Sequence, residues 1–298
     1  MKGSMYYILL VIFYGISLLP LRVLYLLSDF LYLLIYHVVG YRKQVVYENL
    51  RQAFPDKSNA EITGIAKKYY HNLTDMMVET IKLLTMSKKQ LQKRFICDLT
   101  VLRELYAKGK SCQMHLGHNF NWEWANVFCM QGVDFPFLVV YMPLTNKAAD
   151  RLFRHFREKA GSILLPANDM GNSIKPWLDK QYLIALVADQ NPGNPRSCLW
   201  YPFLNKMTPF YKGPEMSAKR HNIPVVFVDI RKPKRGYYNA TLQLQFEDPA
   251  SEPPGRITES FVRFLEKNIH EQPEVWVWSH RRWKHRYEDY IREDHKKQ

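Results

Sequence analysis

Residues 112–123 read CQMHLGHNFNWE, and this stretch contains the pattern that decides the fold. The apolar run 112–116 has the length of a buried strand, and Gly117 separates it from an aromatic-rich segment with a helical pattern. Polar residues at a strand-to-helix junction are typical of the sites of α/β proteins. We therefore expect a strand, then a loop that contains His118, then a helix with Glu123 in its first turn.

The alternation of short apolar runs with helical patterns continues along the chain. The predicted strands are 112–116, 135–141, 163–166, 183–189, 224–230 and 238–246, and the predicted helices are 122–130, 147–160, 211–221 and 257–270. This order predicts an α/β fold, in which a central, mostly parallel sheet is buried on both faces and flanked by helices. Asp189 ends one predicted strand and His118 follows another, so we expect the two side chains to share one cleft.

The preceding residues, 41–110, are predicted to form a helical region. Its elements are a helix at 45–54 that Pro55 stops, a long helix to about Leu84 that a Ser58/Glu61 capping box begins, and a short helix that Ser87 and Gln90 begin. We assign residues 111–290 to the α/β domain and expect the tail, residues 291–298, to be disordered.

Residues 1–40 are predicted to associate with a membrane. Two apolar runs, 5–19 and 23–39, are separated by Pro20 and Arg22. As a helix the first run is about 22 Å long, which is shorter than the roughly 30 Å of a hydrocarbon core. The sequence leaves open a single tilted span, a helical pair inserted from one side and anchored by residues 42–43, or a buried helical hairpin of a soluble protein. A cleaved signal peptide fits poorly, because the apolar pattern runs on without a small-residue cleavage site.

The chain of 298 residues has a formal net charge of +14, which indicates an acidic partner. The densest basic cluster lies at residues 280–286, where Arg281, Arg282 and Lys284 are candidates for binding phosphate. Such a cluster could bind RNA, lipid phosphates or an acidic carrier protein, and the apolar N-terminal segment favours lipid over nucleic acid. The four cysteines form no C-x-x-C pair, which indicates a reducing compartment and no structural zinc site.

His118 and Glu123 are the candidate catalytic pair. A histidine with a carboxylate partner can take a proton from an alcohol, and no serine or cysteine nucleophile is needed if the substrate supplies the hydroxyl. Glu123 in the first turn of a helix could orient the imidazole and stabilise its protonated form. A metal site formed by His115, His118 and Glu123 is an alternative, which the expected position of His115 within a strand makes weaker. We expect no metal and no organic cofactor.

Four ordered blocks resemble those of the bacterial lipid A late acyltransferases, the lauroyl and myristoyl transferases of the glycerol-phosphate acyltransferase superfamily. Residues 117–123 resemble the family's G-H-F-G-N-W-E block, residues 141–146 with Arg157 its second block, residues 188–193 its A-D-Q-x-P-G turn, and residues 273–284 its C-terminal P-E-x-W-x-W-x-H-R-R-W-K signature. The resemblance covers nearly the whole chain and implies a glycerol-phosphate acyltransferase-like fold.

The resemblance also implies a reaction. An acyl group would pass from acyl carrier protein to a hydroxyl of a lipid A precursor, at the cytoplasmic side of the bacterial inner membrane. His118 would be the general base and Glu123 would hold it. Arg157 would contact phosphate or the oxyanion, and Asp189 would support the histidine or an arginine. The remaining candidates for substrate binding are Asn121 and Lys212, together with the three basic residues of the 280–286 cluster.

The sequence departs from the family pattern at two places. Asn119 and Phe120 reverse the usual F-G order, which removes a glycine beside His118, and Lys212 stands where a small or hydroxyl residue is usual. Two other functions stay open. One is acylation of another glycolipid, such as a phosphatidylinositol mannoside, or of a lysophospholipid. The other is a non-enzymatic, basic, membrane-bound scaffold.

Overall fold

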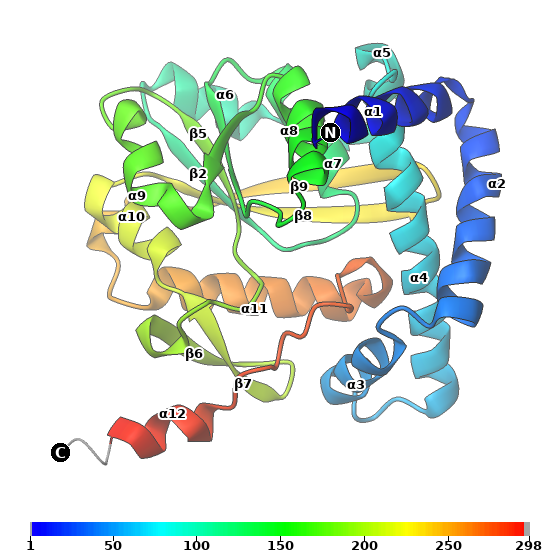
Figure 1. Ribbon diagram of the computed structural model, residues 1–298. Helices are drawn as coiled ribbons and strands as arrows, with labels where there is room; N and C mark the ends of the chain where they lie inside the picture. The colour runs from blue at the N-terminus through cyan, green and yellow to red at the C-terminus, as the bar shows by residue number, and fades with distance from the viewer. Residues whose placement is uncertain (1, 295–298) are drawn as a thin grey trace.

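Seven strands form the central sheet of the computed structural model, which describes residues 2–294 (Figure 1). In spatial order they are β1 (Phe95–Cys97), β9 (Tyr237–Phe246), β8 (Val225–Lys234), β2 (Cys112–Leu116), β5 (Leu183–Val187), β3 (Phe137–Tyr141) and β4 (Ile163–Pro166). The five strands from β8 to β4 run parallel, β9 is antiparallel to β8, and β1 is parallel to β9. The predicted α/β fold with a mostly parallel sheet is confirmed.

Helices cover both faces of this sheet. The main helices are α1 (Lys2–Leu18), α2 (Leu21–Tyr32) with the π-helix η1 (Leu33–Val39), α3 (Lys43–Ala53), α4 (Asn59–Lys82), α5 (Lys88–Gln92), α6 (Thr100–Ala107), α7 (Trp122–Gly132), α8 (Lys147–Lys159), α9 (Met170–Ser173), α10 (Gly213–His221), α11 (Arg256–Glu271) and α12 (Tyr287–Asp294). Short 3₁₀ turns lie at Ala167–Asp169, Lys175–Trp177, Pro195–Ser197, Pro249–Ser251 and Pro273–Val275.

The alternation of side chains along β8 separates the two layers of the core. Val225 and Phe227 pack with α11 and α4, whereas Val226 and Val228 pack with α6 and α7. Side chains of successive strand residues point to opposite faces, so a strand buried on both sides must be apolar at every position. All five side chains of β2 are buried, which places this strand at the centre of the molecule.

The helix starts in residues 41–110 follow the predicted capping chemistry. The Ser58 side chain accepts a hydrogen bond from the backbone of Glu61, whose carboxylate accepts one from the Ser58 backbone, and this capping box begins α4. Ser87 and Gln90 form the same box at the start of α5. The two capping boxes predicted from the sequence are confirmed.

Several elements differ from the sequence predictions, among them the helices α6 and α9, which were not predicted. The region 41–110 also contributes β1 to the sheet, because three residues are too few to show a period. A hairpin of β6 (Cys198–Phe203) and β7 (Lys206–Tyr211) was not predicted. Its turn has positive φ at both Leu204 and Asn205, as a type I′ turn requires, but lacks the Asn-Gly signal of such turns. Residues 291–294, predicted to be disordered, form the end of α12, and residues 295–298 lie outside the described residues.

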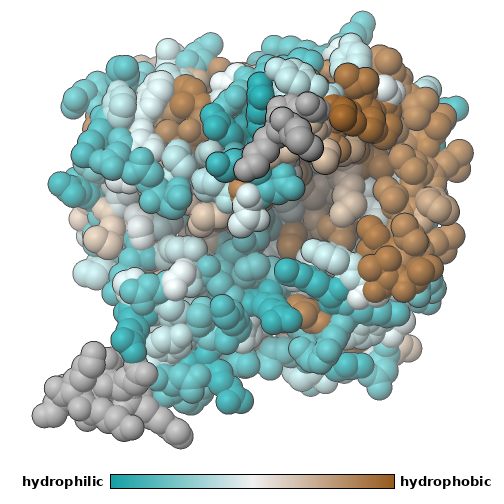
Figure 2. All heavy atoms as spheres, viewed as in Figure 1, coloured by the Kyte–Doolittle hydropathy of each residue, from teal (hydrophilic) through white to brown (hydrophobic). Residues whose placement is uncertain are grey.

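The N-terminal helices carry the most apolar surface that Figure 2 displays. The helix α1 crosses the upper part of the molecule in Figure 1, and after Pro20 the chain turns into α2, which runs alongside α4. Residues Leu21–Val39 are long and apolar enough to cross a membrane. From residue 2 onward the apolar segment forms two helical arms, α1 and the continuous helix of α2 and η1.

Candidate active site

The register of two neighbouring strands brings His118 and Asp189 together. Leu116 of β2 pairs with Val187 of β5, and the two strands run parallel. Each functional residue lies two positions beyond this pair, so both emerge at the carboxyl edge of the sheet. The two side chains meet in a direct hydrogen bond, but only His118 lines the cavity described below, because Asp189 is buried.

The geometry of Asp189 determines the proton position on His118. Its carboxylate accepts hydrogen bonds from the His118 backbone N–H (2.8 Å), from the His118 ring at Nδ1 (2.5 Å) and from the Trp276 indole N–H (2.7 Å). Burial opposes ionisation, but His118 and these hydrogen bonds lower the pKa of Asp189 to about 2. Because the carboxylate is ionised near neutral pH, Nδ1 carries the proton of the neutral ring. The lone pair of that ring is then on Nε2.

The backbone around His118 is held on both sides. Phe120 N–H donates to the carbonyl of Val275 at 2.9 Å, and Asn119 forms an isolated antiparallel bridge with Trp276. A Cβ on Gly117 would lie 2.5 Å from the Leu265 side chain and 3.2 Å from the Asp189 carboxylate, so a larger residue here would displace Leu265 and crowd the carboxylate. Asn119 and Phe120, in contrast, do not have positive φ, so the reversed order requires no glycine there.

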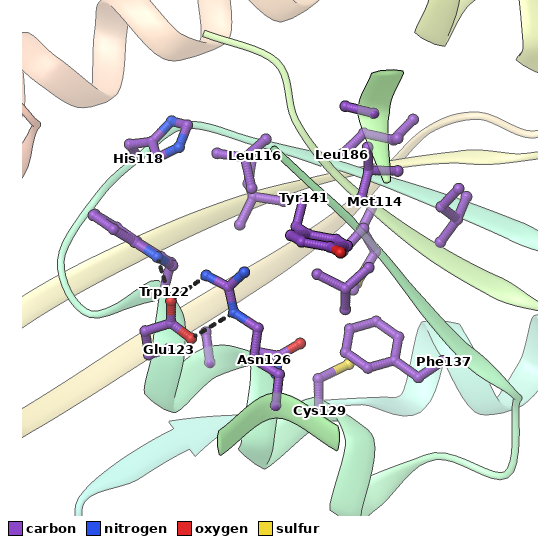
Figure 3. Close-up of a pocket in the computed structure, with 18 of the residues that line it drawn as sticks. Met114, Leu116, His118, Trp122, Glu123, Asn126, Cys129, Phe137, Tyr141 and Leu186 are labelled. Atoms are coloured by element: carbon purple, nitrogen blue, oxygen red, sulfur yellow. Dashed lines mark hydrogen bonds and ion pairs between the residues drawn. The ribbon is translucent and has the colours of Figure 1, made fainter. Parts of the chain in front are cut away.

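Glu123 does not contact His118, and the orienting role predicted for it is wrong for this geometry. Its carboxylate instead forms a bidentate ion pair with Arg157, at 2.5 Å to Nη2 and 3.1 Å to Nε, and accepts from the Trp122 indole N–H at 3.1 Å. The Trp122 ring lies edge-on to the His118 ring, 5.2 Å away, so Trp122 lies between the two predicted partners (Figure 3). Burial acts against the charge of Arg157, but Glu123 outweighs it and raises the pKa of the guanidinium.

A cavity of about 1500 Å³ adjoins both pairs. Clefts for drug-sized ligands measure about 300–1,000 Å³, so this cavity exceeds that range. His118, Glu123 and Arg157 line it together with mostly apolar side chains, among them Met114, Leu116, Cys129, Phe137, Tyr141 and Leu186 (Figure 3). A proton acceptor therefore lies at the wall of a large apolar space, which suits a substrate with long hydrocarbon chains.

Asn121 caps a helix and does not line the cavity. Its carbonyl oxygen accepts from the backbone N–H groups of Glu123 and Trp124, both at 3.1 Å, and its amide donates to Glu79 at 2.9 Å. The side chain is fully buried. The prediction that Asn121 binds substrate is therefore wrong in this structure, and its role is to place the start of α7.

The C-terminal basic cluster is split between surface and interior. Arg281 and Lys284 are exposed, but Arg282 is fully buried and donates to the carbonyl of Pro209 at 2.8 Å and to the Asn191 side chain at 3.1 Å. Its guanidinium lies 4.5 Å from the centre of the Phe210 ring, and burial lowers its pKa to about 10. Arg282 therefore cannot reach a lipid phosphate at the surface, and that prediction is wrong.

Two further residues were named from the sequence, Lys212 as a substrate-binding candidate and His115 as a possible metal ligand. Lys212 is half-buried at the start of α10, between Tyr211 and Gly213, which line the cavity. His115 lies in the core, where its ring contacts Phe227 and Phe261, and burial lowers its pKa to about 3. The alternative metal site needed His115 beside His118, and the fold places it instead on the face of the sheet covered by α11.

Two supporting residues were not found from the sequence. Trp276 donates to Asp189, and Glu79 accepts from the amide of Asn121. Trp276 belongs to the C-terminal block, but the spacing of that block gives no information about its partner. Glu79 lies in the long helix α4, where a single buried glutamate produces no periodic signal.

A histidine–aspartate pair beside a large apolar cavity, on an α/β fold, fits an enzyme with a lipid-like substrate. Residues 2–285 match the family of bacterial lipid A biosynthesis acyltransferases, so the chain belongs to this family and is an acyltransferase. It is similar to the lipid A biosynthesis lauroyltransferase of Escherichia coli (strain K12), with 27% identity over 279 residues that cover 91% of this chain and 88% of the relative. The non-enzymatic scaffold is thereby excluded.

Proposed function

We propose that this acyltransferase moves a fatty acyl chain from the thioester of acyl carrier protein to a hydroxyl of a lipid A precursor. His118 acts as the general base, and Asp189 orients it. The observation that carries this mechanism is the 2.5 Å hydrogen bond from Nδ1 of His118 to the ionised carboxylate, beside a cavity of about 1500 Å³. Family membership supports lipid A biosynthesis as the setting.

The proposed reaction balances without a cofactor. Nε2 of His118 removes the proton of the acceptor hydroxyl while the hydroxyl oxygen attacks the thioester carbonyl. The tetrahedral intermediate collapses, the carbon–sulfur bond breaks, and the proton on Nε2 passes to the departing thiolate. The products are the ester and the free thiol of the carrier protein. Asp189 stabilises the imidazolium that forms between the two proton transfers.

Arg157 is the proposed electrophilic partner. The bidentate pair with Glu123 fixes the guanidinium at the cavity wall through Nε and Nη2. Among the hydrogen bonds of the described residues none uses Nη1, which is free to donate to the developing oxyanion or to an acceptor phosphate. Glu123 in this proposal positions the arginine, while the base is positioned by Asp189.

The proposed partners follow from charge and polarity. Acyl carrier protein is acidic, and the chain has a net charge of +14 with exposed Arg281 and Lys284 near its C-terminus. Lys212, beside the cavity, is a further candidate for contact with the acceptor. We place the enzyme at the cytoplasmic side of the bacterial inner membrane, because the carrier protein is cytoplasmic and the N-terminal helices are apolar.

The test is an assay of the purified protein with acyl carrier protein loaded with saturated chains of different lengths and with a lipid A precursor. Mass spectrometry should detect one added acyl chain, together with free carrier thiol. His118→Ala should reduce the rate by about 10²–10⁴-fold or more.

His270→Ala is the matched control, because this exposed histidine lies on α11 and not among the residues that line the cavity. It should retain the wild-type rate. A wild-type rate in His118→Ala would overturn the mechanism, and acylation of a lysophospholipid in place of the lipid A precursor would overturn the acceptor.

A further inference from the structure

The helix formed by α2 and η1 has an inverted distribution of polarity. Its outward stripe consists of large apolar side chains, namely Val23, Leu26, Phe30, Leu33, Leu34, Val38 and Val39. Its buried face carries the polar side chains of Ser28, Tyr32 and Tyr36 beside Leu21 and Leu24. A surface helix of a soluble protein has the opposite arrangement, with apolar residues facing the core and polar residues facing water.

The outward surface of α1 is also mostly apolar. Tyr7, Ile8, Val11, Ile12 and Leu18 are exposed on it by between 49% and 71%. We call the outward side chains of α1, α2 and η1 the lipid-contact face. It is the brown surface at the right and upper right of Figure 2, where it extends over both helices. Contiguous apolar surface of this extent marks an interaction site.

The buried side of α2 is fastened to α4 along its length. The Tyr25 hydroxyl donates to Glu79 at 2.9 Å, the Ser28 hydroxyl donates to Asp75 at 2.8 Å, and Tyr32 stacks on His71 with ring centres 3.5 Å apart. At about 28 Å the segment Leu21–Val39 could cross a hydrocarbon core by length alone. To do so it would have to leave α4 or draw it into the bilayer.

The helix α4 is unsuited to the bilayer interior. It exposes Lys67 and Lys68, and charged side chains at the bilayer centre are costly. The turn between α1 and α2 is fixed in the same way, since the buried Lys82 of α4 donates to the carbonyls of Ser17 at 2.8 Å and Leu19 at 3.1 Å. Both N-terminal helices are therefore parts of the folded body and not a separate anchor.

We propose that the lipid-contact face lies in one leaflet of the membrane, with α1 and α2 immersed from one side and neither helix crossing. Three exposed tyrosines of this region, Tyr7, Tyr14 and Tyr41, support a lipid partner, because they have the amphipathic rings found at the headgroup level. Exposed Arg22 and Arg42 can contact headgroup phosphates.

Two further observations favour a leaflet over a second copy of the chain. Leu9 and Phe13 of α1 and Leu31 of α2 line the large cavity, so the immersed helices are also walls of the space beside His118. A second copy would bring another net charge of +14 against the first, whereas an anionic leaflet attracts this charge.

Binding to vesicles of phosphatidylethanolamine and phosphatidylglycerol tests the surface. The triple variant Leu26→Ser, Phe30→Ser, Leu33→Ser should bind at least about tenfold more weakly than the wild type, because three large apolar side chains no longer leave water on binding. Met216→Ser, which changes an equally exposed residue on α10, is the control and should bind like the wild type. Equal binding by the triple variant would overturn the proposal.

Depth measurement separates immersion from crossing. A fluorescent label is attached at Val23, Phe30 or Val38, after each is replaced by cysteine in a chain whose four native cysteines are serine, and is quenched by lipids brominated at known depths. An immersed helix predicts one similar depth for the three labels. A crossing helix predicts a deep label at position 30 between two shallow ones, and that result would overturn the proposal.

Dimer formation through the lipid-contact face, the alternative to membrane contact, predicts a different result. It predicts a dimer in lipid-free solution that the triple variant converts to monomer while vesicle binding stays unchanged, and this result would also overturn the proposal. These measurements use no enzymatic activity, so their outcome is independent of the proposed reaction.

A different observation, the buried polar cluster around Glu79, carries a second inference. Glu79 is fully buried, and its carboxylate accepts from the hydroxyl of Tyr25 at 2.9 Å, the hydroxyl of Tyr238 at 2.6 Å and the amide of Asn121 at 2.9 Å. These donors come from α2, β9 and the cap of α7. One side chain thus joins an N-terminal helix, the sheet and the loop that follows His118.

We infer that Glu79 is a positioning residue for the catalytic loop. Asn121 is the N-cap of α7 and lies three residues after His118. Its hydrogen bond to Glu79 therefore fixes the end of the loop that contains His118. The Trp124 indole N–H also donates to the backbone carbonyl of Glu79, at 3.0 Å, which fastens the first turn of α7 to α4 a second time. Small displacements of reacting groups have large effects on rate.

Glu79→Gln tests this inference, because it keeps the shape but presents an amide N–H₂ to the Asn121 amide. We expect kcat to fall about 10- to 100-fold, with KM close to that of the wild type. Ser28→Ala is the control, since it removes a hydrogen bond to the neighbouring Asp75 in the same interior without touching Asn121. At matched thermal stability it should keep its kcat.

A purely structural role for Glu79 predicts that the two variants lose kcat in proportion to their loss of stability, and this result would overturn the inference. If Glu79→Gln folds poorly, Tyr238→Phe removes one of the donors to the same carboxylate and should lower kcat in the same direction. The inference rests on the proposed function. An inactive His118→Ala beside a fully active Glu79→Gln refutes only the positioning role, whereas an active His118→Ala refutes both.

Discussion

A single buried carboxylate decides which nitrogen of His118 can act as a base. Asp189 accepts from three N–H groups, and among the hydrogen bonds of the described residues none requires it to be protonated. In the proposed mechanism the histidine then presents Nε2 to the substrate. This conclusion depends on the hydrogen bonds of one residue and not on the family resemblance.

The pH dependence of stability should reveal this carboxylate. The pKa of Asp189 is lowered from 3.8 to about 2, so its contribution is present above about pH 4 and is lost as the pH falls toward 2. The shift corresponds to about 2 kcal/mol of unfolding free energy. Urea unfolding between these pH values should show a steeper loss of stability for the wild type than for Asp189→Asn. Parallel curves would contradict this assignment.

A side chain at position 117 should destabilise the fold. Gly117→Ala places a methyl group against Leu265 and the Asp189 carboxylate, and we expect the unfolding free energy to fall by about 1–3 kcal/mol. Gly64→Ala is the control, because the added Cβ meets nothing within 4 Å on the exposed side of α4. That variant should gain about 0.5–1 kcal/mol. Similar effects in denaturant unfolding of the two variants would argue against the close approach at Gly117.

At the scale of elements, strand ends could be predicted from the sequence and helix-to-helix partners could not. The apolar runs identify β2 and β5, and parallel pairing brings their carboxyl ends to one edge, which is why His118 and Asp189 could be expected to meet. The partner of Glu123 depends on how α8 packs against α7. The i+5 spacing from His118 contains no information about that packing, so the predicted pair was wrong.

The burial of Arg282 is a second feature that could not be predicted from the sequence. A sequence rich in arginine at residues 280–286 predicts an exposed basic surface. The hairpin of β6 and β7, which the sequence did not reveal, provides the Phe210 ring and the Pro209 carbonyl that enclose Arg282. Arg282 was predicted to bind phosphate at the surface, but the unpredicted hairpin encloses it in the core.

The ion pair between α7 and α8 should stabilise the protein more than a neighbouring surface pair does. Glu123→Gln leaves the half-buried Arg157 without a charged partner, and we expect a loss of about 1.5–3 kcal/mol. Glu158→Gln breaks the exposed pair with Arg154 on the same helix and should cost at most about 0.5 kcal/mol. Thermal or urea unfolding of both variants checks this. Equal losses would mean that the pair with Glu123 is also solvent-screened.

At the scale of the whole molecule, apolar surface and positive charge have separate roles. The lipid-contact face is formed by the N-terminal helices, while the net charge of +14 belongs to the chain as a whole. Immersion of apolar side chains is insensitive to salt, but attraction to an anionic leaflet is screened within about one Debye length.

Salt should therefore separate the two contributions. Raising sodium chloride from about 0.05 M to about 0.5 M should weaken binding to vesicles that contain phosphatidylglycerol and should leave binding to neutral phosphatidylcholine vesicles nearly unchanged. Vesicle sedimentation measures both. Complete release from neutral vesicles at high salt would contradict an apolar contact.

His118 and Asp189 act as one catalytic unit in the proposed mechanism, and a double-mutant cycle measures the coupling between them. The quantity is kcat/KM for acyl transfer by the wild type, His118→Ala, Asp189→Asn and the double variant. We expect each single variant to lose about 10²–10⁴-fold and the double variant to be no slower than His118→Ala. A double variant that loses the product of both single effects, or an Asp189→Asn enzyme with wild-type kcat/KM, would contradict the account.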